Sequence, residues 1–537
     1  MIFFSSICNN AVDSASVTSL EFPVWIVQIS TDPSQCKTLP SIEYIELQTV
    51  KCSYTLLCSL LSSLLTLDHK VKFELIDCEI TSCVKGAVSI LFNTGNVIIR
   101  TENEKIAVSL LDDKLLNALN GLNINSLSLD DRCKAFRENH KESLSQTLVL
   151  LLQLDKLSIS VLDSTPDQWK TLHGLNIKSL SLRMIEVNHA ESLSQSLSSL
   201  KQLEMLSIEV FDDTPDQWKT LHGLNIKSLI LRMREVNHAE LLSQSLASLK
   251  QLEMLSIDVD NGNRAPWEAL HGLGIKSLSL SGIWSGFDHG LTVNNAKSLK
   301  QSILSLKQLE TLNVDVYEDT PGLWEALQGL SIKSLSLSGQ IIEFKNATSL
   351  KKSISSLKQL ETLDVSVIEE YSNTVLWEAI QGLSIKSLRL SCFNVNFEEK
   401  YATSLKQLIV SLKELNTLTV DVNAHNPNMW VVFQSLNIKS LSLNLSKNGG
   451  FGVKYATSLK QSILSLKELD TISISVDYDG PGLWEALHSP SIKSLRLRGI
   501  DGGFERKYAE SLEQWLSSLT KLDPLNIRSM SMSLGSK

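Results

Sequence analysis

The chain has 537 residues, a formal net charge of −9 and an isoelectric point of about 5.7. This mildly acidic balance argues against a broad nucleic-acid-binding surface, and no apolar run approaches the about 18 residues of a membrane span. The start, MIFFSSICNNAVDSAS, lacks the basic residues that open a secretory signal. Seven of the eight cysteines lie before residue 134, and the chain is too long and too poor in cysteine for a disulfide scaffold. We therefore expect a cytoplasmic protein with reduced thiols.

The first hundred residues are the least regular part of the sequence. Residues 1–50 match no regular template, and we expect an irregular segment there. From 56 to 78 the chain reads LLCSLLSSLLTLDHKVKFELIDC, an apolar helical stretch followed by an alternating strand. We predict a degenerate repeat over 51–105 that caps the array after it.

The rest of the chain is an internal repeat that tryptophan marks. Seven tryptophans occupy one motif position, with spacings of 49, 49, 57, 53, 53 and 54 residues. They are Trp169, Trp218, Trp267, Trp324, Trp377, Trp430 and Trp484. Self-similarity at a fixed period is typical of repeat architectures. We predict about eight double repeats of 49–57 residues over 106–530, and a disordered tail over 531–537.

Each double repeat contains two strands and two helices. The stretches IKSLSL (177–182) and LSIEV (206–210) alternate apolar with polar residues, as a strand with one buried face does. Between them, NHAESLSQSLSSLKQL (188–203) places leucines on one helical face, and Asn188 with Glu191 resembles a capping box. A short helix begins at TPDQW (214–218). Strands joined by helical crossovers must run parallel.

These motifs resemble a known superfamily. LKQLEMLSIEV (200–210) matches the LxxLxxLxI core of leucine-rich repeats, and IKSLSL matches its strand segment. The chain resembles the ribonuclease-inhibitor-like C-terminal repeat region of NOD-like (NACHT-LRR) immune receptors. The resemblance implies an α/β solenoid, a curved horseshoe with parallel strands on its concave face and helices on its convex face. The family's loop asparagine or cysteine is replaced here by Ile185 and Phe211, and no GxxxxGK[ST] nucleotide-binding stretch is found.

The residue types that suggest chemistry are repeated too regularly to form a single site. A catalytic lysine needs one desolvated copy beside a partner, whereas the IKSL lysine recurs in seven equivalent copies, where we expect its ammonium group to reach solvent. Histidines of LHGL lack metal-ligand spacing, and the tryptophans are typical of core. The lysines are Lys178, Lys227, Lys276, Lys333, Lys386, Lys439 and Lys493. We expect no enzyme, cofactor or metal; the alternative is an enzyme in residues 1–105 with a reactive cysteine.

The outward positions between strand leucines are the candidate partner-binding residues, because a solenoid of this kind meets partners on its strand face. The acidic candidates are Glu209, Asp258, Asp315, Asp364 and Asp421. The basic candidates are Arg389 and Arg496, and the loop candidates that depart from the repeat are Trp284 and Phe287. The acidic positions favour a basic protein partner.

Together these patterns predict a non-catalytic protein-recognition module. The near-identical double repeats and the resemblance favour the sensor, or ligand-binding, region of a NOD-like innate immune protein. Two alternatives remain open: a substrate adaptor for ubiquitin ligation, which requires an F-box-like segment, and an extracellular adhesion protein, which predicts glycan at Asn346. We expect no nucleic-acid partner and no membrane span.

Overall fold

The computed structural model describes the secondary-structure elements and many of the turns between them. The described ranges are 25–26, 44–48, 51–53, 71–76, 79–82, 97–102, 104–108, 124–129, 141–161, 166–184, 189–210, 214–233, 236–259, 266–281, 293–315, 321–339, 347–367, 374–392, 399–423, 427–434, 436–446, 453–478 and 494–503. The chain divides into two compact units, Met1–Leu229 with Ser248–Gln251 and Ser536–Lys537, and Ile230–Ala247 with Leu252–Gly535.

The first unit contains two sheets. One has the strand order β1-β2-β4-β6, in which β1 is antiparallel to β2 and the other pairs are parallel. Its strands are β1 (Trp25–Ile26), β2 (Tyr44–Gln48), β4 (Val71–Ile76) and β6 (Val97–Glu102). The strands of the other sheet are β3 (Lys51–Ser53), β5 (Glu79–Ser82), β7 (Glu104–Val108), β8 (Ile124–Leu129), β9 (Lys156–Val161), β10 (Ser179–Met184) and β11 (Met205–Val210). Its helices are α4 (Lys141–Leu150), α5 (Pro166–Lys170), α6 (Ala190–Ser199) and α7 (Pro215–Lys219).

The second unit continues the strand–helix alternation after β12 (Ser228–Met233), the strand in which the boundary falls. Its strands are β13 (Met254–Val259), β14 (Ser277–Ser281), β15 (Thr311–Asp315), β16 (Ser334–Gly339), β17 (Thr362–Val367), β18 (Ser387–Cys392), β19 (Thr417–Asn423), β20 (Ser440–Ser446), β21 (Thr471–Tyr478) and β22 (Ser494–Gly503). Its helices are α8 (Ala239–Ser248), η2 (Pro266–Leu270), α9 (Val293–Ser305), α10 (Pro321–Leu327), α11 (Ala347–Ser356), α12 (Thr374–Ile380), α13 (Glu399–Ser411), α14 (Pro427–Val432) and α15 (Val453–Ser465). The last residue of α8, Ser248, is assigned to the first unit.

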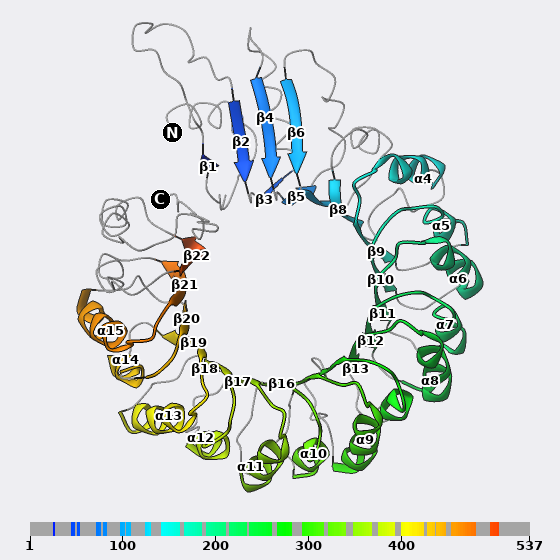
Figure 1. The fold of residues 1–537 in the computed structure, drawn as a ribbon. Coiled ribbons are helices and arrows are strands. Elements are labelled where there is room, and N and C mark those ends of the chain that lie inside the picture. The colour runs from blue at the N-terminus through cyan, green and yellow to red at the C-terminus, as the bar shows by residue number, and fades with distance from the viewer. Residues whose placement is uncertain are drawn as a thin grey trace, which may run out of the picture. The chain divides into compact units, whose positions relative to one another are not determined.

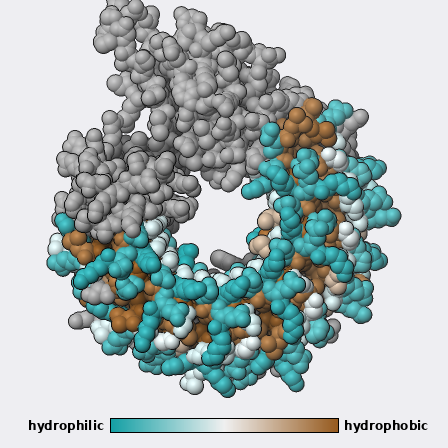
Figure 2. Space-filling view, viewed as in Figure 1, coloured by the Kyte–Doolittle hydropathy of each residue, from teal (hydrophilic) through white to brown (hydrophobic). Residues whose placement is uncertain are grey.

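Parallel pairing in register stacks the leucines of successive strands. Leu335 in β16 lies beside Leu312 on one side and Leu363 on the other, and all three are fully buried. In the second unit the strands line one side and the helices the other (Figure 1). Figure 2 shows hydrophobic residues between a hydrophilic strand-side margin and a hydrophilic helix-side margin. The predicted α/β leucine-rich-repeat solenoid is confirmed for the described residues, whereas the predicted division into 1–50, 51–105 and 106–530 stays a prediction.

The repeated glycines and serines hold the short helices against the long helices. Gly329 and Gly382 adopt a φ of +79°, which favours glycine, and end their short helices. The N–H of Gly329 donates to Ser356 Oγ (3.0 Å), and the Ser353 hydroxyl donates to the carbonyl of Trp324. These bonds satisfy polar groups at the helix ends that would otherwise lack partners. The glycines and serines of the repeated LxGL and SL motifs therefore recur because they hold neighbouring helices together.

The helix starts differ in part from the sequence prediction. Helix α6 has His189 as its N-cap, in a left-handed conformation with no side-chain cap, and the predicted cap Asn188 lies outside the described residues. At α7, where a short helix was predicted, Thr214 and Gln217 form a capping box in which the Thr214 N–H donates to Gln217 Oε1 at 3.3 Å. Six of the seven repeat tryptophans are buried as predicted, with Trp324 and Trp430 fully buried, and Trp484 lies outside the described residues.

Candidate binding surface

Five of the repeated lysines lie where strands begin and pair with the acidic residue that precedes the neighbouring strand. We call this row of charges the strand-start edge. Its ion pairs, by Nζ–O distance, are Lys178–Asp155 (3.0 Å), Lys227–Glu204 (2.9 Å), Lys276–Glu253 (2.9 Å), Lys333–Glu310 (2.8 Å) and Lys386–Glu361 (2.8 Å). The lysine side chains are 52–54% exposed, so the predicted solvent-facing position is confirmed.

Backbone hydrogen bonds fix the geometry of this edge. The carbonyl of Glu310 accepts the N–H groups of Lys333 (2.8 Å) and Ser334 (3.0 Å), and the Lys333 carbonyl then accepts the N–H of Glu361. The hydrogen bond and positive charge of Lys333 hold the pKa of the Glu310 carboxyl below its usual range, and Lys386 does the same to the pKa of Glu361. The strand-start charges therefore satisfy one another.

The outward side of the strands, which we call the strand face, carries the predicted acidic residues in two rows. Glu209, Asp258, Asp315 and Asp421 follow the second buried residue of their strands, and Asp315 lies opposite Ser338. Asp364 instead lies opposite Ser336, two residues earlier in the strand. Asp364 is therefore out of line with the other four acidic residues by one outward position. Most other outward positions are small and polar, such as Ser279, Ser336, Thr419 and Ser442.

Two of these acids are paired with arginines that the sequence analysis did not single out. Arg183 Nε lies 3.0 Å from Glu209 Oε1, its direct cross-strand neighbour. Arg232 Nε lies 3.8 Å from Asp258 Oδ2, and Asp258 is only 5% exposed. The sequence signal that could have identified both arginines is their shared position, the arginine of the LRM motif that ends β10 and β12. Asp258 consequently offers little surface to a partner.

Arg389 lies between two carboxylates of neighbouring strands. Its Nε is 3.9 Å from Asp364 Oδ2, and its Nη2 is 3.7 Å from Asp421 Oδ2. The side-chain amide of Asn444 donates to Asp421 Oδ1, and Asp421 is 7% exposed. Three predicted candidates therefore meet in one cluster, in which two negative charges share one guanidinium.

Burial sets the ionisation of the more accessible acids. Desolvation raises the pKa of Asp315, although the Ser338 hydroxyl donates to its carboxylate at 3.3 Å. Desolvation also raises the pKa of Asp364; Arg389 offsets part of this rise and the charge of Asp421 adds to it. A positive group from outside would favour the charged form of both carboxylates.

The remaining candidates are placed only in part. Arg496 pairs with Ser473 between β22 and β21, but its side chain lies outside the described residues. Trp284 and Phe287 lie outside the described residues altogether. No described group of three or more His, Cys, Asp or Glu side chains could hold a metal ion, and no described helix has the length and apolarity of a membrane span.

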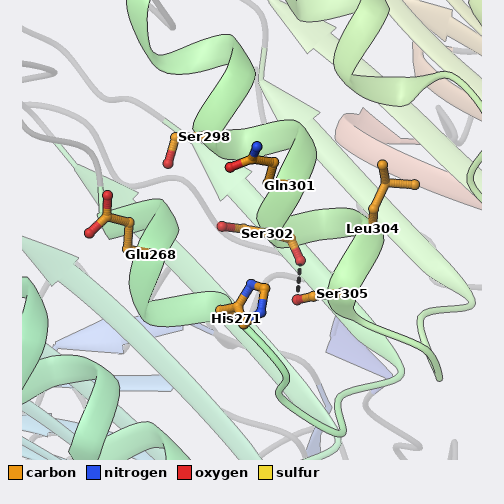
Figure 3. Close-up of a pocket in the computed structure, with 7 residues that line it drawn as sticks. All are labelled: Glu268, His271, Ser298, Gln301, Ser302, Leu304 and Ser305. Carbon is orange, nitrogen blue, oxygen red and sulfur yellow. Dashed lines mark hydrogen bonds between the residues drawn. The ribbon is translucent and has the colours of Figure 1, made fainter.

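A polar cleft of about 500 Å³ lies between η2 and α9 on the helical side (Figure 3). Its wall residues are Glu268, His271, Ser298, Gln301, Ser302, Leu304 and Ser305. Ser305 Oγ accepts the Gly272 N–H at 2.8 Å and donates to the Ser302 carbonyl at 2.6 Å. The serines here make the same contacts as in other repeats, so the cleft is a gap between packed helices and not a constellation for chemistry.

Comparison with known proteins finds similarity at the level of structure alone. No protein-family model and no curated protein sequence matches the chain. A crystal structure of a TLR13–ssRNA13 complex matches at 16% identity with a TM-score of 0.39, over 90% of this chain and 67% of that one. The leucine-rich-repeat-containing protein LegL7 from Legionella pneumophila matches at 15% identity with a TM-score of 0.35, over 69% of this chain and 100% of that one. The fold assignment rests on the strands and their register.

Proposed function

We propose that the chain is a non-catalytic protein-recognition module that binds a basic partner on the strand face. The observation that carries this proposal is the position of Asp315 and Asp364, whose half-buried carboxylates have a pKa raised by burial. The small hydroxyl side chains around them leave room for another chain. A lysine or arginine from a partner would stabilise both carboxylates, and charge complementarity would speed its encounter with the surface.

The finer form of this proposal is the sensor region of a NOD-like innate immune protein in the cytoplasm. Support comes from the resemblance of the repeats and from the duplicated stretch TPDQWKTLHGLNIKSL, which occurs twice, at 165–180 and at 214–229. Variation between otherwise identical copies falls on outward positions such as Ile230 and Arg389, where it changes contacts and leaves the core intact.

The test compares the strand face with the strand-start edge. Extended basic, neutral and acidic peptides are titrated by fluorescence anisotropy against the wild type, the Asp315→Asn/Asp364→Asn variant and a matched control, Glu310→Gln/Glu361→Gln. Both variants remove two charges from the same two repeats. We expect the face variant to weaken basic-peptide binding by about tenfold and the control by less than about twofold. Equal losses in the two variants, or a preference for acidic peptides, would refute the proposal.

The expected absence of a nucleic-acid partner is tested in the same assay. Single-stranded RNA is added at low and at physiological salt, and we expect no change in its anisotropy, because the strand face carries carboxylates that repel phosphate. Saturable RNA binding that falls steeply with salt would contradict this expectation.

A further inference from the structure

Three neighbouring helices of the second unit expose aliphatic side chains. Val410 near the end of α13 is 60% exposed, Val431 in α14 is 45% exposed, and Leu464 near the end of α15 is 50% exposed. Helix α14 packs against both α13 and α15, and the three helices lie next to one another in Figure 1. We call these three residues the apolar strip.

Val431 is an exception among the copies of its position. It directly follows the buried Trp430, and the residue after the motif tryptophan is charged in all the other copies. Those residues are Lys170, Lys219, Glu268, Glu325, Glu378 and Glu485. A charge at this position keeps the short helix hydrated; its replacement by valine joins the exposed side chains of α13 and α15 across α14.

Val431 and Leu464 occupy the positions of Glu268 and Leu304 in the repeat. At that equivalent helix pair, Glu268 of η2 and Leu304 of α9 both line the same cleft. Between α14 and α15, the Ser462 hydroxyl donates to the carbonyl of Trp430, which ties the last turn of α15 to the residue before Val431. At α14 an exposed valine thus replaces the charged residue that η2 has at this position.

Lysines surround the strip. Lys406 and Lys460 lie one helical turn before Val410 and Leu464, on the same helix faces. Lys413 and Lys467 follow just beyond the ends of α13 and α15, each next to a glutamate, Glu414 and Glu468. The surroundings thus have four positive and two negative side chains, whereas α14 itself (PNMWVV) has no charge.

We propose that the apolar strip docks an acidic amphipathic helix of a protein partner, with its aliphatic face on Val431 and its carboxylates on the surrounding lysines. Two like-charged strips repel one another, which argues against a second copy of this chain as the occupant. A membrane surface is a poorer fit, because interfacial helices insert aromatic anchors and the strip is aliphatic. This surface lies on the helices and acts separately from the strand face.

The experiment uses the full chain and a synthetic helical peptide with leucines on one face and glutamates on both flanks. The key variant is Val431→Glu, which restores the charge found at the equivalent positions Glu325 and Glu378 and is therefore compatible with folding. We expect the peptide to protect amides of α14 and of the last turns of α13 and α15 from hydrogen exchange. We expect Val431→Glu to weaken binding by about tenfold or more, because the new carboxylate would be buried without a partner under the aliphatic face of the peptide.

The matched control is Leu304→Ser, which removes an aliphatic residue at the Leu464 position of α9, outside the strip. It should change peptide affinity by less than about twofold, and the same peptide with lysines for glutamates should bind at least about tenfold more weakly than the acidic one. Unchanged affinity in Val431→Glu, equal binding of the two peptides, or no binding overturns the proposal. Two further outcomes overturn the proposal. One is a dimer of the chain in sedimentation that Val431→Glu abolishes. The other is binding to phosphatidylserine vesicles, without peptide binding, that Val431→Glu abolishes.

Discussion

Two carboxylates at opposite ends of one strand show opposite electrostatics. Glu310 immediately precedes β15 and Asp315 ends it. The pKa of Glu310 is lowered because Lys333 bonds to it at 2.8 Å, whereas the pKa of Asp315 is raised because burial is only partly offset by the Ser338 hydroxyl. The same contrast recurs on the next double repeat between Glu361 and Asp364. The charges of the strand-start edge compensate one another, whereas burial leaves Asp315 and Asp364 on the strand face with a raised pKa.

This contrast separates charges that serve the repeat from charges left for recognition. Compensation at the strand-start edge recurs with the period of the motif because five of the repeated lysines each meet the acid that precedes the neighbouring strand. The strand face changes from one copy to the next, and Asp315 and Asp364 carry a desolvation penalty that an incoming cation would offset. Repetition thus indicates geometry, and deviation from it indicates where binding energy is available.

The largest expected effect comes from removing the core that supports both regions. Trp430 is fully buried, and Trp430→Ala should reduce the free energy of unfolding by about 3–5 kcal/mol through lost burial and a cavity. Chemical denaturation combined with hydrogen exchange of β19 and β20 measures it. The neighbouring exposed Val431→Ala is the control and should change stability by less than about 0.5 kcal/mol; a comparable loss there would contradict the assigned burial.

A smaller effect is expected from Arg389→Ala on the strand face. The substitution leaves Asp364 and Asp421 without their shared guanidinium, and Asp421 is largely buried. After a discount for the exposure of Arg389, we expect a loss of about 1–2 kcal/mol at neutral pH and a further rise in the pKa of Asp364, measured by denaturation and carboxyl NMR. Arg389→Lys should recover part of both, and an unchanged pKa would show that the cluster is not coupled.

The raised pKa of Asp315 predicts a pH dependence of stability with a definite sign. A carboxyl whose pKa is higher in the folded state favours folding below its unfolded pKa, and this contribution is lost as pH rises through the folded pKa. The Asp315→Asn variant lacks this pH-dependent loss. The stability of the variant relative to the wild type should therefore increase from acidic to neutral pH. Denaturation curves at several pH values check this, and a relative decrease toward neutral pH would show that the Ser338 hydrogen bond dominates.

The smallest effect on stability is expected at the strand-start edge. In Lys333→Met the pKa of Glu310 should rise toward its ordinary value, with no measurable change in melting temperature, because both side chains are solvent-exposed. The carboxyl pKa of the pair is lowered and its ammonium pKa is raised. Any contribution of the pair to folding stability is therefore present at pH values between these two pKa values, and it is lost at very low and very high pH. Carboxyl NMR measures the shift, and an unmoved Glu310 pKa would contradict the pairing.

Much of the fold could be predicted because its determinants are local. Alternation in IKSLSL and the leucine spacing of 188–203 reflect strand and helix periods, which depend only on neighbours in the chain. The tryptophans could be assigned to the core because a large apolar residue at a fixed repeat position must be buried between copies. The helix start at His189 escaped prediction because its left-handed backbone is not the usual N-cap conformation.

The sequence by itself determined that the chain is a strand–helix repeat, which residues turn inward, and that lysine begins alternate strands. Only the tertiary structure decided which charges meet, because pairing depends on the register of strands more than twenty residues apart: Lys333 with Glu310, Arg183 with Glu209, and Arg389 between Asp364 and Asp421. It also decided that Asp258 and Asp421 are buried although their positions alternate outward, and that Val410, Val431 and Leu464 remain exposed. Periodicity specifies the direction of a side chain, whereas accessibility depends on what the neighbouring repeat places beside it.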